Sequence, residues 1–264
     1  MKKLIAIILT LVMVLSLVAC AGNKAPAADA PAADAPAADA PVADAPAADE
    51  APEATDAPAA DDEVAVMTYA DYAAAAMDSE VIVECYVQDH QSWWDNKITV
   101  YAADADGAYF LYEMACSEED AAKLVPGTKI RVTGFKGEWA GEVEIMDATF
   151  EFVDGDTYIA EPLDVTALLG TDELINHQNQ LAAFNGLTVE AIEYKNGEPG
   201  DDIYLTLSLD GNSYSFCVEV YLTGTESDVY TTVGTLNVGD VVNVEGFLYW
   251  YEGVNPHITA IALA

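Results

Sequence analysis

The stretch Gly127-Thr128-Lys129-Ile130-Arg131-Val132-Thr133-Gly134-Phe135 decides the fold of this chain, because it recurs 112 residues further on. The second copy reads Gly239-Asp240-Val241-Val242-Asn243-Val244-Glu245-Gly246-Phe247, and both follow the pattern Gly-x-x-[Ile/Val]-x-Val-x-Gly-Phe. Apolar and polar residues alternate along it, which predicts a half-buried strand with Ile130 and Val132 facing inward. The chain therefore contains two copies of one β-rich unit.

The first copy has further strand signals on both sides of this stretch. Strands are expected at 81–87, 98–101, 109–114 and 143–152, with a hairpin turn at 104–107 between the second and third. Thr68 followed by Asp71 predicts a capped helix before the first strand. Ser117 followed by Asp120 predicts a second short helix between the third and fourth strands.

The second copy repeats this order. Strands are expected at 187–192, 203–209, 214–221 and 238–247, with a turn at 210–212, a helical stretch at 228–233 and a last strand around Ile258, which matches Ile145. Residues 162–183 separate the two copies, and 172–183 reads as a helix with Thr171 as its cap.

Five strands with a short helix between the third and fourth are the order of the OB-fold barrel. The Gly-x-x-hydrophobic-x-Val-x-Gly string resembles the fourth strand of OB-fold domains, where the first glycine starts the strand and the second allows a bend. The chain is similar over residues 78–153 and 184–264 to tandem OB-fold lipoproteins of gut Firmicutes. The resemblance implies a mostly β fold of two tandem five-stranded OB-fold-like barrels, although short glycine-spaced strands also occur in sandwiches.

The N-terminus reads as a targeting segment. Lys2 and Lys3 precede an apolar run, 4–18, that is short for a membrane span and typical of a secretory signal. The run ends in Leu17-Val18-Ala19-Cys20, which resembles a bacterial lipobox and implies cleavage after Ala19 and lipid on Cys20. We therefore expect an extracytoplasmic protein anchored by lipid to the cell membrane; an ordinary signal with an accidental Cys20 is the alternative.

An Ala/Pro/Asp repeat follows, with five pentads between residues 25 and 49. Proline at every fifth position prevents helix, and no core can form from these three residue types, so a disordered tether is expected. The expected division is signal 1–19, lipidated cysteine and linker 20–63, first domain 64–160, inter-domain linker and helix 161–183, and second domain 184–264.

The charge is strongly negative, with 9 basic against 46 acidic residues and a net charge of −37. Nucleic-acid binding depends on clustered Lys and Arg that displace counterions, so nucleic acid is excluded as an expected partner. Cationic partners, divalent metals and neutral ligands fit this charge better. The alternative is that the acidic surface only keeps an exported protein soluble.

The OB-fold resemblance implies a ligand face flanked by loops, and aromatic residues fall in those loops. The candidate ligand-binding residues are Trp93, Trp94, Trp139, Tyr249, Trp250 and Tyr251. Indole and phenol rings there are suited to stack on a sugar or to grip an apolar peptide segment. The alternative is that these rings cover the open ends of the barrels.

No constellation for catalysis, metal or cofactor binding stands out. The acidic stretches at 104–107, 154–156 and 198–202 lack a complete calcium-loop pattern and read as turns. His90, His177 and His257 are isolated, and no nucleophile elbow is present. Cys85, Cys116 and Cys217 are an odd number, either buried thiols or a Cys85–Cys116 bridge with one left over.

Two functions remain open on this basis. One is a non-enzymatic binding module that captures a glycan, a peptide or a protein through the aromatic loops. The other is a structural or assembly subunit of an envelope protein complex without a small ligand. A hydrolase is a third and less supported hypothesis, because the chain has no recognisable nucleophile or metal set.

Overall fold

The computed structural model describes residues 65–264, which belong to one compact unit. The expected signal segment, Cys20 and the Ala/Pro/Asp linker lie outside the described residues. Within 65–264, no helix is long and apolar enough to cross a membrane.

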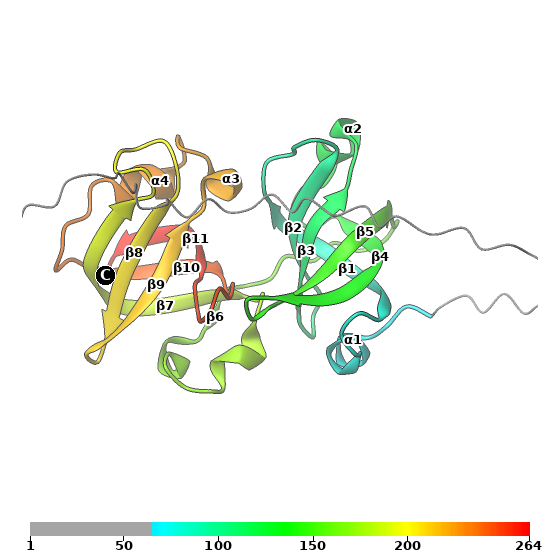
Figure 1. Ribbon diagram of the computed structural model, residues 1–264, viewed down its shortest axis with the longest axis horizontal. Helices are drawn as coiled ribbons and strands as arrows, with labels where there is room; N and C mark the ends of the chain where they lie inside the picture. The colour runs from blue at the N-terminus through cyan, green and yellow to red at the C-terminus, as the bar shows by residue number, and fades with distance from the viewer. Residues whose placement is uncertain (1–64) are drawn as a thin grey trace, which may run out of the picture. The chain divides into compact units, whose positions relative to one another are not determined.

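The first barrel follows the expected strand order. Its elements are α1 (Tyr69–Ala74), β1 (Glu80–His90), β2 (Lys97–Ala103), β3 (Ala108–Ala115), α2 (Glu118–Ala121), β4 (Lys129–Trp139) and β5 (Glu142–Phe152). The strands close in the order β1-β2-β3-β5-β4, and β4 pairs back onto β1 (Figure 1). Thr68 caps α1 with a complete capping box, and the Ser117 side chain caps α2, both as predicted.

The second barrel repeats that order. Its strands are β7 (Leu181–Tyr194), β8 (Ile203–Leu209), β9 (Asn212–Val218), β10 (Val241–Phe247) and β11 (His257–Leu263), with α3 (Val220–Thr223) and α4 (Asp228–Val233) between β9 and β10. Pairing of β10 with β7 closes the ring β7-β8-β9-β11-β10, as in the first barrel (Figure 1). A two-residue strand, β6 (Leu163–Asp164), adds to β7. The fold is thus two tandem OB-fold-like barrels, as predicted.

The glycines of the repeated stretch have two separate structural roles. Gly127 and Gly239 precede β4 and β10 with φ of 87° and 96°, a conformation that side chains disfavour. A Cβ on Gly134 would lie 2.8 Å from the Met146 carbonyl oxygen, and one on Gly246 would lie 2.3 Å from that of His257. The second glycine therefore allows the close approach of the last two strands.

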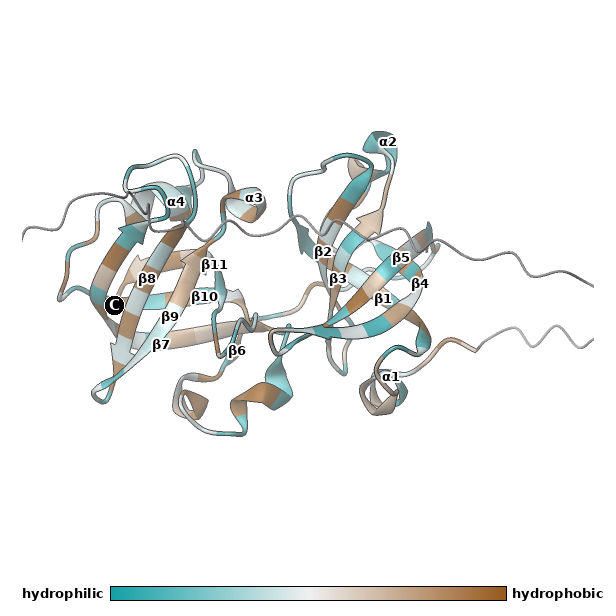
Figure 2. Cartoon of the chain, viewed as in Figure 1, coloured by the Kyte–Doolittle hydropathy of each residue, from teal (hydrophilic) through white to brown (hydrophobic). Residues whose placement is uncertain are grey.

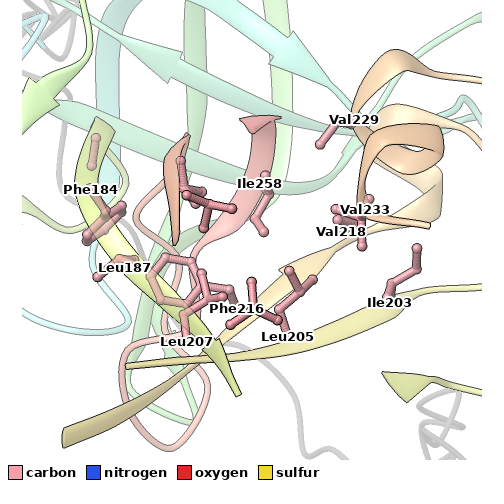
Figure 3. Packing of buried hydrophobic residues seen from close by; sticks show 14 of the residues in the cluster. Phe184, Leu187, Ile203, Leu205, Leu207, Phe216, Val218, Val229, Val233 and Ile258 are labelled. Atoms are coloured by element: carbon pink, nitrogen blue, oxygen red, sulfur yellow. The ribbon is translucent and has the colours of Figure 1, made fainter. Parts of the chain in front are cut away.

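Each barrel has its own hydrophobic core. In the first, Ile130 and Val132 are fully buried, which confirms their inward direction. In the second, side chains from the strands and α4 gather inside the ring (Figure 3). Apolar and polar residues alternate along β8, so one face of the strand supplies the core (Figure 2).

The segment between the barrels differs from the expectation. The prediction of a helix over 172–183 is wrong. The segment forms two short 3₁₀ turns, η1 (Thr166–Leu168) and η2 (Leu174–His177), and β7 already begins at Leu181. Pairing with β10 and β6 draws residues 181–183 into the sheet, which outweighs the local helical preference. The third strand of the second copy also ends at Val218, before the expected residue 221.

Candidate functional site

Trp94 stands on a tight hairpin between β1 and β2. The Trp94 and Lys97 backbones exchange two N–H···O hydrogen bonds of 3.0 and 2.9 Å. Asp95 and Asn96 between them take φ of 45° and 62°, the two left-handed residues of a type I′ turn. The indole of Trp94 is 77% exposed, so a fixed backbone presents a large aromatic face to solvent.

A cavity of about 310 Å³ lies beside this ring. Its wall includes Gln91, Ser92 and Thr99 from the first barrel and Tyr221 from α3 of the second. The Ser92 backbone N–H and hydroxyl both donate to the Tyr221 carbonyl oxygen, at 2.7 and 3.1 Å. Both barrels therefore contribute to one cavity.

A second cavity, of about 500 Å³, shares Lys97 and Glu113 with the first. Its wall includes Tyr112 from β3 and Met146 from β5. The Lys97 Nζ and a Glu113 carboxylate oxygen are 2.7 Å apart, so this ion pair marks the boundary between the two cavities. Together the two cavities form the β2–β3 groove, defined as the residues that line either one.

Unusual backbone conformations gather along the β2–β3 groove. Four of the nine non-glycine residues with positive φ in the described part of the chain line it: Asp95, Asn96, Glu113 and Asp147. Glu113 and Asp147 lie at register shifts of their strands, where a bulge redirects side chains. The Glu113 backbone N–H donates to Thr99 Oγ1 at 3.1 Å, which holds the bulge against β2.

The groove combines exposed rings with polar and mostly acidic side chains. Asp95, Glu113 and Asp147 provide three carboxylates against the single ammonium of Lys97. The hydrogen bond to Glu113 raises the pKa of Lys97. Exposed rings beside carboxylate, ammonium, amide and hydroxyl groups are suited to stacking and hydrogen bonding.

Three of the six candidate aromatic residues are engaged in packing. Trp93 packs against the first core, and its Nε1 donates to the Cys116 carbonyl oxygen at 2.9 Å. Trp250 packs against the second core. Tyr249 stacks on His257 with ring centroids 4.2 Å apart. Trp93 and Trp250 thus pack against the core of their own barrel, whereas Tyr249 packs on the cluster of Tyr101, Phe110 and Phe247.

Trp139 and Tyr251 form a separate exposed pair. Their ring centroids are 5.1 Å apart, and the two side chains are about half exposed. Neither lines the β2–β3 groove. Of the six candidates, only Trp94 belongs to it.

Sequence reasoning did not identify Tyr112 and Tyr221 as groove residues. Tyr221 falls where the third strand of the second copy was expected to continue, and no sequence signal joins it to Trp94. Tyr112 is 43% exposed at the bulge of β3, where two neighbouring residues both face solvent, so simple strand alternation could not predict its direction.

The residues considered for metals and disulfides have structural roles. Asp104 Oδ1 accepts from the backbone N–H groups of Asp106 and Gly107, each at 2.8 Å, as expected for a turn. Within 65–264, no group of three His, Cys, Asp or Glu side chains is arranged for a metal ion. Cys85, Cys116 and Cys217 are free and buried, so the alternative Cys85–Cys116 bridge is absent.

Comparisons with known proteins bear on the fold alone. No family model and no curated protein matches the chain. Among solved structures, a murine DNA-binding protein bound to double-stranded DNA is 11% identical, with 69% of this chain and 96% of that chain covered and a TM-score of 0.35. The p202 HIN1 domain with a 12-mer double-stranded DNA is also 11% identical, with coverages of 71% and 94% and a TM-score of 0.31.

These matches correct one expectation. The negative charge of the sequence excluded nucleic acid as an expected partner. However, three of the solved structures that this chain matches contain double-stranded DNA: the two above and the Ifi202 HINa domain with a 20-base-pair duplex. The exclusion of nucleic acid is therefore withdrawn. A TM-score between 0.31 and 0.35 assigns no ligand to this chain, so nucleic acid belongs among the ligands to be tested.

Proposed function

We propose that this chain is a non-enzymatic binding protein whose β2–β3 groove holds an oligosaccharide. The observation that carries the proposal is the indole of Trp94, 77% exposed on a hairpin of fixed geometry and bordering a cavity of about 310 Å³. Sugar rings have apolar faces that stack on such an indole, and a ring already held in place loses little entropy on binding.

The polar lining of the groove supports the same ligand class. Gln91, Thr99 and the Lys97–Glu113 pair surround the cavity beside Trp94 with amide, hydroxyl and charged groups. These groups offer both donors and acceptors, which is what the hydroxyls of a sugar require. A groove with a few placed polar groups beside exposed rings is a common form of ligand site.

The proposed location rests on the N-terminal segment. The order of positive residues, apolar run and lipobox-like Leu17-Val18-Ala19-Cys20 supports lipid attachment at Cys20 and export from the cytoplasm. In that arrangement the Ala/Pro/Asp linker holds the two barrels at a distance from the cell membrane. Metabolic labelling with a fatty acid, lost on Cys20→Ala, tests this part separately.

The groove is tested by comparing two exposed tryptophans. Trp94→Ala should weaken oligosaccharide binding by roughly thirtyfold, as expected for an aromatic side chain at the centre of a site. Trp139→Ala is the matched control, because Trp139 is 53% exposed and lies outside the groove. Titration calorimetry with N-acetylglucosamine and glucose oligomers, alongside unstructured peptides and single- and double-stranded oligonucleotides, measures both variants.

Each outcome decides the proposal. Oligosaccharide binding that Trp94→Ala weakens and Trp139→Ala preserves supports it. Binding of only peptide or only oligonucleotide would replace the ligand class, and equal loss in both variants would move the site away from the groove. The melting temperature of each variant, expected to stay near wild type, separates lost binding from lost folding.

A further inference from the structure

Glu142 is a fully buried carboxyl group that contacts the other barrel. It begins β5 of the first barrel and is 0% exposed. Its Oε2 accepts a hydrogen bond of 2.8 Å from the backbone N–H of Trp250, which lies between β10 and β11 of the second barrel. Its Oε1 is buried without a hydrogen-bond partner.

Asn179, in the segment between the barrels, lies within hydrogen-bonding reach of the Glu142 carboxyl. Its Nδ2 donates to the Val143 carbonyl oxygen at 3.0 Å, and its backbone N–H donates to the Leu248 carbonyl oxygen at 2.9 Å. Its Oδ1 is buried without a partner as well. If the side-chain O and N of Asn179 were exchanged, its Oδ1 would face the Val143 carbonyl oxygen, and two acceptors would meet. The orientation of the Asn179 amide is therefore fixed.

Two buried acceptors are thus left without a donor in one place. An unsatisfied buried polar atom costs about 1–3 kcal/mol, so native structures rarely leave two together. A carboxylic acid, unlike a carboxylate, has one O–H to donate. A proton on Glu142 Oε1 would make that atom a donor, and Asn179 Oδ1 is a buried acceptor that such a donor requires.

We propose that Glu142 carries a proton on Oε1 and donates it to Asn179 Oδ1, forming a latch that joins the first barrel to the second. In this latch Oε2 accepts from Trp250, Oε1 donates to Asn179, and Asn179 binds Val143 on one side and Leu248 on the other. The proposal is independent of the ligand in the β2–β3 groove.

The surroundings of Glu142 favour the protonated form. Burial, with a smaller contribution from Glu144, raises the pKa of Glu142 to about 9, against the lowering effect of the Trp250 hydrogen bond. An Asn179 amide that donated to the carboxylate would also lower this pKa, whereas in the latch Asn179 accepts, which favours the protonated acid. The other titratable groups that feel its charge are Tyr72, Tyr101 and Tyr249. None of these groups is a cation. The buried Lys136, whose Nζ lies 5.1 Å from the centre of the Tyr72 ring, donates to three carbonyl oxygens at the end of α1 instead.

The latch has a defined pH dependence. In the unfolded chain Glu142 ionises near its ordinary pKa of 4.5, whereas in the folded chain it holds the proton up to about pH 9. Between these values the folded state binds more protons than the unfolded state, so this contribution to stability falls as the pH rises. It is fully present below about pH 4.5 and lost above about pH 9.

Glu142→Gln tests the latch, because the glutamine amide donates as the protonated acid does and does not titrate. In the full-length protein, the variant and the wild type should have similar melting temperatures near pH 5. Above that pH the variant should become progressively more stable than the wild type, up to about pH 9. Glu144→Gln is the control on the same strand: burial raises the pKa of Glu144 to about 7, so its advantage should stop growing near pH 7.

A second measurement keeps the test independent of folding yield. The infrared carbonyl band of a protonated carboxylic acid should be present in the wild type at pH 8 and reduced in Glu142→Gln. A constant difference in melting temperature at every pH, a Glu142→Gln variant that is less stable throughout, or an unchanged infrared band would each overturn the latch.

Discussion

At the residue scale, two glycines of β4 show that the cost of replacing a glycine depends on what lies opposite it. Gly134 and Gly137 lie three residues apart on β4, and neither has a positive φ. A Cβ on Gly134 would meet the backbone of β5, whereas one on Gly137 would meet only the flexible end of the Met146 side chain. Backbone atoms cannot move aside without disturbing the β4–β5 pairing, but a methionine side chain can.

Gly134→Ala should therefore lower the free energy of unfolding by about 1–3 kcal/mol, the usual cost of overpacking. Gly137→Ala, the control on the same strand, should change it by less than about 1 kcal/mol. Urea unfolding of both variants measures the difference. Equal effects would show that β4 and β5 can separate locally, contrary to the close approach described above.

At the element scale, α1 depends on a lysine from a distant strand. Lys136 of β4 is buried, and its Nζ donates to the carbonyl oxygens of Tyr72, Ala73 and Ala75, at 3.0, 2.8 and 3.0 Å. These carbonyls lie at the end of α1, where a helix leaves its acceptors without partners. Burial lowers the pKa of Lys136. A helix of six residues is too short to be stable alone, so this contact holds it on the barrel.

Lys136→Met keeps the length of the side chain and removes its donors. We expect a loss of about 1–3 kcal/mol and faster hydrogen exchange at the amides of α1. Lys123→Met is the control, because the exposed ion pairs of Lys123 with Glu119 and Asp120 and its contact of 5.9 Å with the centre of the Phe152 ring contribute little. Unchanged exchange in Lys136→Met would assign the stability of α1 to its capping box and aromatic packing instead.

The sequence predicts these elements where the signal is local. Alternation identifies the strands, and Thr68, Ser117 and the repeated glycines mark where elements begin, because caps and left-handed turns depend on nearby residues. The segment 172–183 could not be predicted correctly from local signals. Its last residues join β7 because they pair with β10, which lies more than sixty residues further along the chain. The same limit applies to the site: exposed Trp94 was identified, but Tyr221 reaches it only through the contact between barrels.

At the scale of the whole molecule, the two barrels meet through buried aromatic and ionisable groups. The Tyr101 ring stacks on Phe247 with centroids 4.3 Å apart, and its hydroxyl shares a hydrogen bond with Nδ1 of His257. Phe110 completes the buried cluster, with Tyr249 packed against it. Burial lowers the pKa of His257 to about 3, so the imidazole is neutral in the folded protein.

His257 should contribute a loss of stability in acid, opposite in sign to the contribution of Glu142. Below about pH 6.5 the unfolded chain binds a proton on His257 that the folded chain refuses down to about pH 3, so stability decreases as the pH falls through this window. The loss is on the order of 4 kcal/mol. His257→Gln removes this titration, so the melting temperature of the variant should rise relative to that of the wild type as the pH falls from 7 to 4. Parallel curves would mean that His257 reaches solvent in the folded state.

The closure of both sheets has a consequence for behaviour at high concentration. β4 returns to β1 and β10 returns to β7, so every long strand within residues 65–264 has a partner on each side. The rings close through a single residue pair between β3 and β5 and between β9 and β11. The strand at the edge of the second sheet, β6, is two residues long. Unpaired edges are where β-proteins add strands from neighbouring molecules, and very short edges discourage this. At high concentration, neighbouring molecules can therefore stay separate rather than merge into fibres.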